Sequence, residues 1–464
     1  MGVFIDDGTP RMTETVLAQQ LWHQGGWQSH CRIELDGAGR IAAIHANDTA
    51  CAAANAWVLP GITNLHSHAF QRAMAGLAER RGHSDDSFWS WREVMYAFAE
   101  RIQPDDLRDI AAQLYVEMLK AGYTRVCEFH YLHQQADGTP YADPAAMSLA
   151  LIEAAREAGI GLTLLPVLYQ TGGFDGRALS PRQRRFGLDT DAYLGVLERL
   201  NGMRDGQLDV GIALHSLRAV PAAAMAAVLA SPLAQQCPIH IHIAEQLGEV
   251  QDCLALRNAR PVEWLLDHAA IDRRWCLVHA THLSADECRR AAATGAVAGL
   301  CPSTEGNLGD GLFPLRDWMD AGGALGVGSD SHISISPVEE LRWLEYGQRL
   351  ISGKRNVAAA AGHSVGETLW QAALDGGARA AGQAAPLSAG SSADLSVLDA
   401  ASPLLAARDN TSVLDSFLFS GNTPLVRDVM AGGRWQVRDF HHRDEERIAA
   451  RFRRTVNALR QNPR

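Results

Sequence analysis

The sequence predicts an α/β fold: a TIM-like (β/α)8 barrel with a small β-sandwich domain built from both chain ends. Eight short apolar runs recur after residue 57, and alanine-rich stretches suited to amphipathic helices separate them. A pattern of short strands separated by turn residues occurs only at the two ends of the chain. An open, doubly wound sheet is the alternative, but polar residues at the ends of several different runs favour the barrel.

The chain is expected to divide into three segments. Residues 1–58 alternate apolar and polar positions, as in 31–35, and carry turn signals such as Asp-Gly-Ala-Gly at 36–39. The barrel is expected over residues 59–385. Residues 386–464 are expected to complete the small domain and to add a terminal helix.

The eight apolar runs are the predicted barrel strands. Near-continuous apolar strands are typical of a parallel sheet whose outer face is covered by helices. Eight of them in one domain favour a closed barrel. The runs are Val58–Leu65, Arg125–His130, Leu162–Tyr169, Val210–His215, Ile239–Ala244, Cys276–His279, Ala296–Cys301 and Ala324–Asp330.

The segments after the eighth run return from helix to strand. Helices are predicted over 337–350 and 364–381, and strands within 392–399 and 426–437. These strands are expected to pair with the amino-terminal unit. The charged stretch 443–460 predicts a helix, expected to be solvated or to lie at the edge of a dimer.

Composition and charge narrow the class of protein. With 464 residues, 47% of them hydrophobic, the chain can form one large domain and a smaller one. A net charge of -11 argues against nucleic acid as a partner. No apolar run reaches the ~18 residues of a membrane span, and residues 1–7 lack signal-peptide features. The cysteines show no CxxC spacing, so buried reduced thiols and a cytoplasmic location are expected.

His66 and His68 stand one residue apart at the end of the first run. Side chains alternate along a strand, so both rings would face the same side and could share one metal ion. On a helix they would diverge by about 200°. Pro60-Gly61 and the β-branched neighbours favour a strand. Two unrelated loop histidines are the alternative for this motif alone.

Later strand ends offer further candidate ligands. The side chains of His240 and His242 are expected on the same side of the fifth strand, but His240 lies one pleat further from the carboxyl end of that strand. Three neutral imidazoles and a carboxylate suit one Zn²⁺ ion, with Fe²⁺ or another divalent ion as alternatives. A lone histidine is more often a hydrogen-bonded core residue, but a chance meeting of these strand ends is improbable. The predicted metal ligands are His66, His68, His242 and Asp330.

The strand-end motifs resemble the amidohydrolase superfamily in its mononuclear deaminase branch. They are PGxxxxHxH in the first run, HIHIAE in the fifth, a histidine after the sixth and Ser-Asp in the eighth. The resemblance covers the whole chain. Many members bridge two metal ions with a carboxylated lysine on the fourth strand. That run contains neither Lys120 nor Lys354, the two lysines of the chain, so one ion is expected.

Longer motifs are similar to the formimidoylglutamate deiminase family. They span 64–72, 88–93, 215–218 and 301–311, with Gly306 where alanine is expected. The resemblance implies zinc-dependent hydrolysis of N-formimino-L-glutamate to N-formyl-L-glutamate and ammonia in histidine degradation, by a homodimer. The alternatives are a same-fold deaminase acting on a purine, pterin or triazine ring, and a scaffold without activity.

The catalytic roles follow from this chemistry. A bound metal ion lowers the pKa of water from 15.7 towards about 7, which makes an attacking oxygen available at neutral pH. Asp330 is expected to take the proton of that water, and Glu245 to carry a proton to the departing nitrogen. His279 is expected to donate a hydrogen bond to the attacking oxygen. No redox cofactor is required.

A substrate with two carboxylates calls for fork-shaped cationic donors. Arg218 and Arg92 are the predicted carboxylate ligands, and His215, beside Arg218 at the fourth strand end, is a further predicted substrate-binding residue. For Arg92, a helix-surface ion pair is the alternative. Tyr131 and Gln71 are added as substrate-binding residues on the family resemblance alone.

Overall fold

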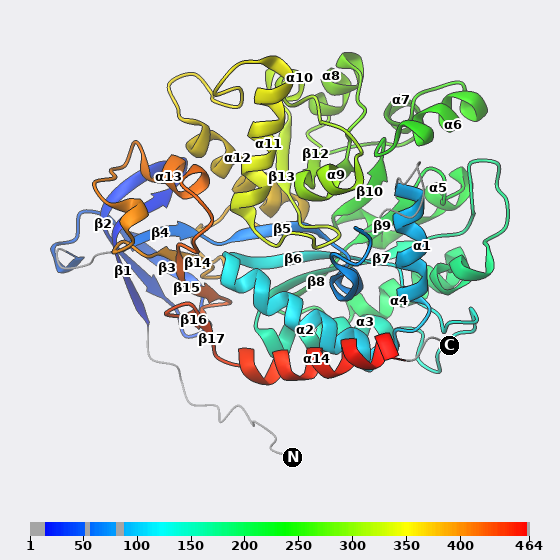
Figure 1. The fold of residues 1–464 in the computed structure, drawn as a ribbon, viewed down its shortest axis with the longest axis horizontal. Helices are drawn as coiled ribbons and strands as arrows, with labels where there is room; N and C mark the ends of the chain where they lie inside the picture. Colours follow the sequence, from blue (N-terminus) through cyan, green and yellow to red (C-terminus); the bar gives the residue numbers. More distant parts are fainter. Residues whose placement is uncertain (1–13, 52–55, 80–87, 462–464) are drawn as a thin grey trace.

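Two β-sheets organise the chain in the computed structural model, which describes residues 14–51, 56–79 and 88–461 (Figure 1). One is a mixed sheet of eight strands and the other is a parallel barrel. Helices surround the barrel, and the mixed sheet lies at its side, where the blue amino-terminal and orange-red carboxyl-terminal strands meet. Residues 1–13 and 52–55 of the predicted amino-terminal unit lie outside the described residues.

The mixed sheet is built from both ends of the chain, as predicted. β4 joins the two halves, because it pairs in parallel with β1 and antiparallel with β14. The strand order is β17-β16-β15-β14-β4-β1-β2-β3. The strands are β1 (Thr15–His23), β2 (Gly26–Leu35), β3 (Ile41–His45), β4 (Trp57–Pro60), β14 (Leu395–Leu398), β15 (Val426–Ala431), β16 (Arg434–Arg438) and β17 (His441–His442).

The predicted barrel is confirmed as a nearly closed parallel sheet. Its order is β13-β12-β11-β10-β9-β7-β6-β5, with β8 paired to β7. A parallel bridge between Ser67 and Asp330 links the last strand to the first. The strands are β5 (Ile62–Ser67), β6 (Tyr123–His130), β7 (Gly161–Leu168), β8 (Leu208–Val210), β9 (Ile212–Ser216), β10 (Ile239–Ile243), β11 (Trp275–His279), β12 (Val297–Leu300) and β13 (Ala324–Val327).

Two predicted barrel strands are interrupted by glycine. Val58–Leu65 was expected to be one barrel strand, but β4 belongs to the mixed sheet and β5 begins after Gly61. A Cβ atom at Gly61 would lie 2.3 Å from Thr124 Oγ1, so only glycine allows the chain to pass from one sheet to the other here. The fourth run breaks similarly at Gly211, between β8 and β9.

The helices mostly follow the strands and cover the outside of the barrel. They are α1 (Phe88–Ala99), α2 (Pro104–Ala121), α3 (Ala146–Ala158), α4 (Thr190–Asn201), α5 (Ala222–Ala230), α6 (Leu247–Arg257), α7 (Pro261–His268), α8 (Ala285–Ala293), α9 (Pro302–Leu308), α10 (Leu315–Asp320), α11 (Pro337–Ser352), α12 (Val365–Ala380), α13 (Val413–Phe419) and α14 (Glu445–Gln461). Short 3-10 helices lie at Thr49–Cys51, Ala69–Met74, Pro181–Phe186, Pro232–Gln235 and Pro403–Leu405. No helix among the described residues combines the length and apolar character needed to cross a bilayer.

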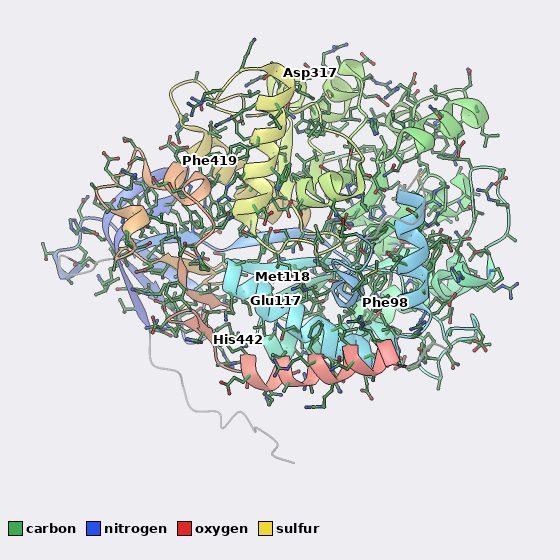
Figure 2. All side chains as sticks on the ribbon, viewed as in Figure 1. Phe98, Glu117, Met118, Asp317, Phe419 and His442 are labelled. Atoms are coloured by element: carbon green, nitrogen blue, oxygen red, sulfur yellow. The ribbon has the colours of Figure 1, made fainter. Side chains whose placement is uncertain are left out.

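The terminal helix α14 packs along the barrel instead of standing in solvent (Figure 1). Ile448 is fully buried, and Thr455 Oγ1 donates to Asp109 Oδ2 of α2 at 2.9 Å. His442, labelled in Figure 2, donates from Nε2 to the Ala158 carbonyl at the end of α3, at 2.8 Å. The predicted helix is therefore present, with an exposed face that includes Arg447 and Arg453, while its apolar stripe covers α2.

Candidate metal centre and active site

The four predicted metal ligands meet at the carboxyl ends of β5, β10 and β13. His66 Nε2 lies 3.2 Å from His68 Nε2 and 3.0 Å from His242 Nε2. Asp330 Oδ1 lies 3.5 Å from His66 Nε2 and 3.3 Å from His68 Nε2. All four side chains are buried. The same-side geometry expected for the His-x-His pair is therefore present.

Most of these spacings suit ligands of a single divalent ion. A tetrahedral Zn²⁺ with bonds of about 2.0–2.1 Å separates neighbouring ligand atoms by about 3.3 Å. The four separations of 3.0–3.5 Å match that figure. The ligand atoms of His66, His68 and Asp330 form one group within 4.8 Å of one another, and His242 forms another with His66 and His279. His68 Nδ1 donates to the Phe129 carbonyl at 2.8 Å, which leaves the lone pair of Nε2 for a metal ion.

The electrostatics of the cluster also favour metal binding. Burial lowers the pKa of His66 to about 3 and lowers the pKa of His68 and His242 as well, so these imidazoles are neutral at pH 7. Burial alone would raise the pKa of Asp330, but the hydrogen bond with His66 and the charge of His279 hold it well below its usual range. Asp330 is therefore ionised at neutral pH and could act as an anionic ligand.

The backbone at the barrel seam sets the position of Asp330. Asp330 N donates to the His66 carbonyl at 3.0 Å, and His68 N donates to the Asp330 carbonyl at 3.2 Å. A Cβ atom at Gly328 would lie 2.7 Å from His66 N, so glycine permits this close approach. Asp330 itself has a φ of 43°, a strained value that the surrounding hydrogen bonds maintain.

His279 stands beside the cluster among three carboxylates. Its Nε2 lies 3.9 Å from Glu245 Oε1 and 3.8 Å from Asp330 Oδ2, and its Nδ1 lies 3.4 Å from Glu305 Oε1. Burial alone lowers the pKa of His279, but these carboxylates raise it to about 10. His279 can therefore donate hydrogen bonds from both ring nitrogens. Burial raises the pKa of Glu245, which favours its carrying a proton.

A cavity of about 80 Å³ opens onto this cluster and brings the remaining predicted residues together. Gln71 Nε2 donates to the Tyr131 hydroxyl at 3.0 Å, while the buried Gln71 Oε1 has no partner among the described residues. Arg92 Nη2 donates to the Tyr169 hydroxyl at 3.4 Å. The predicted residues that line the cavity are His68, Gln71, Arg92, Tyr131, His215, Arg218, His242, Glu245, His279 and Asp330.

Arg218 brings positive charge to the wall of this cavity. It is half-buried, and its guanidinium makes no hydrogen bond or ion pair within the part of the chain that the structure describes. Burial alone would lower its pKa, but Tyr169, Glu249 and Glu245 raise it, so the group stays charged. A half-buried, unpaired guanidinium is suited to an anionic ligand.

Several residues of this site were not predicted from the sequence. Tyr96, Tyr169 and Phe186 line the cavity with aromatic rings. Glu249 accepts hydrogen bonds from the Ala244 and Glu245 amides and so fixes the end of β10. Glu305 lies within the 301–311 motif, but its contact with His279 depends on how α9 folds over the barrel. Only that motif could have pointed to it.

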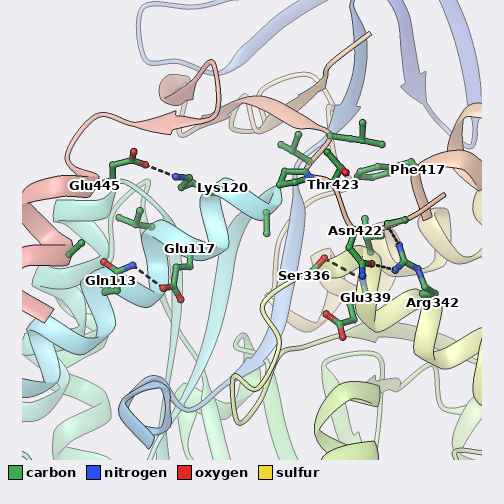
Figure 3. Close-up of a pocket in the computed structure, with 18 of the residues that line it drawn as sticks. Gln113, Glu117, Lys120, Ser336, Glu339, Arg342, Phe417, Asn422, Thr423 and Glu445 are labelled. Carbon is green, nitrogen blue, oxygen red and sulfur yellow. Dashed lines mark hydrogen bonds and ion pairs between the residues drawn. The ribbon is translucent and has the colours of Figure 1, made fainter. Parts of the chain in front are cut away.

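Two larger cavities lie elsewhere. One of about 990 Å³ lies between α2, α11 and α14 and contains none of the predicted site residues (Figure 3). Its charged groups pair with one another, as in the contact of Lys120 Nζ with Glu445 Oε2 at 2.6 Å. The chemistry therefore belongs to the smaller cavity, where neutral imidazoles and perturbed carboxylates converge.

No cysteine is among the predicted site residues, but Cys301 stands beside them. All eight lie within the described residues, where they are buried and form no disulfide. Cys301 Sγ lies within 4.8 Å of ligand atoms of His279 and Asp330, but burial raises its pKa well above the usual value. It is therefore a neutral thiol, in agreement with the predicted reduced state.

A barrel with such a cluster at its carboxyl end defines a metal-dependent hydrolase, and the chain belongs to the amidohydrolase family, whose sequence profile matches residues 57–436. It is 51% identical over 449 residues to the formimidoylglutamate deiminase of Pseudomonas aeruginosa, covering 96% of this chain and 99% of that protein. A crystal structure of an amidohydrolase from Brucella melitensis has a TM-score of 0.91 at 45% identity, over 96% and 99% of the two chains.

A zinc-bound relative shares the fold. The crystal structure of an adenosine deaminase from Xanthomonas campestris with bound zinc has a TM-score of 0.79, over 97% of this chain and 98% of that one. Its identity of 20% supports a common architecture and no more. The chain is therefore an amidohydrolase with deiminase relatives, and its buried histidine and aspartate cluster suits a divalent metal ion.

Proposed function

We propose that this protein hydrolyses N-formimino-L-glutamate to N-formyl-L-glutamate and ammonia, a reaction of histidine degradation. The observation that carries the proposal is a single cavity that connects a His/Asp metal cluster to the arginines Arg92 and Arg218. The 51% identity to a formimidoylglutamate deiminase over nearly the whole chain supports the same reaction.

The proposed cofactor is one Zn²⁺ ion, held by His66, His68, His242 and Asp330. Fe²⁺ or another first-row ion is the alternative, because the same donors accept it. When bound, the ion lowers the pKa of a coordinated water towards about 7 and so makes a nucleophile available at neutral pH. Support comes from the ligand spacing and from the neutral state of the three imidazoles.

Two side chains of the cavity then transfer protons, and a third donates a hydrogen bond. The Asp330 carboxylate accepts the proton of the water that attacks the formimino carbon, and His279 Nε2 donates a hydrogen bond to the attacking oxygen. Glu245 carries two protons to the imino nitrogen, the first from the attacking water as the tetrahedral adduct forms and the second from the hydroxyl of that adduct, so that the nitrogen leaves as neutral ammonia instead of an amide anion. The carbon–nitrogen bond breaks as the carbonyl of the formyl group forms.

The glutamate half of the substrate is proposed to lie between the arginines. Arg218 and Arg92 each bind a carboxylate, and His215, packed on the Tyr169 ring at 4.4 Å between centroids, holds this wall in place. Gln71 Oε1 accepts a hydrogen bond from the substrate N–H, and Tyr131 orients the Gln71 amide. Each of these contacts discriminates against a flat ring amine.

The protein is further proposed to be a cytoplasmic homodimer. The family resemblance supports this state, since its members are expected to pair. Light scattering of the purified protein measures the mass directly. A monomer at micromolar concentration contradicts the proposed dimer without affecting the proposed reaction.

The reaction is tested by following ammonia release from the zinc-loaded protein. N-formimino-L-glutamate is compared with adenine, guanine, a pterin and a triazine amine at equal concentration. The proposal expects turnover of N-formimino-L-glutamate alone. Turnover of a ring amine without turnover of N-formimino-L-glutamate replaces the proposed substrate with the alternative class, and the absence of both supports an inactive scaffold.

A further inference from the structure

A buried carboxylate lies behind the His-x-His segment, outside the cavity. Glu128 of β6 is 2% exposed, and its Oε1 accepts a hydrogen bond from Ala69 N at 2.6 Å. Its Oε2 accepts from Ser67 Oγ at 2.6 Å and from the Tyr115 hydroxyl at 3.3 Å. Ser67 and Ala69 flank His68 in the chain, so Glu128 holds the backbone on both sides of this ligand.

A directed chain of hydrogen bonds runs through this carboxylate. Ser67 Oγ donates to Glu128 Oε2, so the Ser67 oxygen is left to accept a hydrogen bond from His332 Nε2 at 3.2 Å. His332 Nδ1 is then the acceptor for Ser329 Oγ at 2.9 Å, and Ser329 Oγ accepts from Asn64 Nδ2 at 2.7 Å. The chain of hydrogen bonds therefore begins at Asn64 and ends on Glu128.

This chain of hydrogen bonds links the two segments between which the barrel closes. Asn64 and Ser67 belong to β5, while Ser329 and His332 flank Asp330 after β13. The sheet itself joins these segments by the isolated bridge between Ser67 and Asp330. The hydrogen bonds that end on Glu128 therefore fix the segments that carry His66, His68 and Asp330, from the side opposite to the ligand atoms.

We propose that Glu128 is a positioning residue of the metal centre, which sets the direction of His66 and His68 through Ser67 and Ala69. The inference rests on the proposed metal-dependent function, but it concerns metal binding and not the choice of substrate. Outer partners of metal ligands fix ring orientation, and their removal typically weakens metal affinity by about 10- to 100-fold. Glu128 does not contact the histidine rings themselves; it bonds to Ser67 and Ala69, the residues on either side of His68.

Glu128→Gln tests the proposal. Glutamine keeps the shape but offers one acceptor oxygen, so its amide group must face either Ser67 Oγ or Ala69 N, both of which are donors. We expect Zn²⁺ and Co²⁺ affinity, measured by competition with a chelator, to fall about 10- to 100-fold. The visible absorption of the Co²⁺ form, which reports ligand geometry, is expected to change, and circular dichroism to stay that of the folded protein.

Glu345→Gln is the matched control. Glu345 of α11 is also fully buried and accepts hydrogen bonds from the Val357 and Ala358 amides at 3.0 and 2.9 Å, remote from the cavity. This variant should lose thermal stability and keep wild-type metal affinity and the wild-type Co²⁺ spectrum. Equal loss of metal affinity in both variants would mean that general destabilisation, and not positioning, explains the effect.

A second variant keeps the test decisive if Glu128→Gln does not fold. Ser67→Ala removes the link between Glu128 and His332 while the carboxylate keeps the Ala69 amide, so a smaller loss of affinity and a changed Co²⁺ spectrum are expected. Wild-type metal affinity and spectrum in the folded variants overturn the proposal. If the wild-type protein binds metal but leaves N-formimino-L-glutamate intact, the proposed substrate fails while these measurements still decide the role of Glu128.

Discussion

Arg218→Ala tests whether the cavity is built for a dicarboxylate. The Arg218 guanidinium stays charged and has no partner among the described residues, so the proposed substrate carboxylate is its counter-ion. In the variant that carboxylate enters the cavity without its cation. The remaining carboxylates Glu245 and Glu249, which line the same cavity, then repel it.

The size of the effect follows from the burial of this pair. Removing one partner of a buried, hydrogen-bonded charge pair costs about 2–5 kcal/mol. Arg218 is only half-buried, which places the loss near the lower end, at about 2–3 kcal/mol. At 1.36 kcal/mol per tenfold change, kcat/KM should fall about 30- to 160-fold.

The assay compares substrates that lack one carboxylate each. N-formimino-4-aminobutyrate lacks the α-carboxylate, and N-formimino-L-alanine lacks the side-chain carboxylate. If Arg218 binds the α-carboxylate, Arg218→Ala should lower kcat/KM for N-formimino-L-alanine and leave kcat/KM for N-formimino-4-aminobutyrate unchanged. If Arg218 binds the side-chain carboxylate, the two results should be reversed. Arg289→Ala, an exposed surface substitution on α8, is the control. Unchanged kcat/KM in Arg218→Ala, or equal losses with both truncated substrates, refutes the assignment.

Three further predictions concern the proton carrier, the metal ion and acid stability. Glu245→Gln should lower kcat about 10²- to 10⁴-fold with metal content retained, and kcat near the wild-type value contradicts its role. Removal of metal with 1,10-phenanthroline should abolish ammonia release and lower Tm, and Zn²⁺ should restore both; activity that survives in metal-free protein contradicts the proposed chemistry. Burial alone raises the pKa of Glu445, but Lys120, His441 and a backbone amide lower it to about 2. Its pairing therefore stabilises the fold fully above the unfolded pKa of about 4.5 and loses this effect as pH falls towards 2. Glu445→Gln should lower Tm at pH 7, by an amount equivalent to at most about 1 kcal/mol, and less at pH 3; an equal decrease at both pH values counts against the pairing.

The barrel could be predicted because its strands are buried on both faces. Runs such as 162–169 and 239–244 are apolar without alternation, and the structure has strands at both. What the apolar pattern does not encode is which sheet a strand joins. The run 58–65 crosses between the sheets at Gly61, and the reason is a close approach to Thr124 that only the folded chain reveals.

The meeting of the proposed metal ligands could be predicted for a related reason. A period of two puts His66 and His68 on one side, and parallel strands bring the carboxyl end of β10 to the same edge. Glu128 and Glu305 escaped prediction because their contacts are made across elements, from the far side of β5 and from the short helix α9. A single buried carboxylate in a sequence carries no sign of its partners.

Anomalous diffraction at the zinc edge, from crystals of protein purified without chelator, shows whether one ion lies in the His/Asp cluster. We expect one strong peak per chain, bonded to His66 Nε2, His68 Nε2, His242 Nε2 and Asp330. A peak elsewhere, two peaks in the cavity, or none in protein that hydrolyses N-formimino-L-glutamate would contradict it.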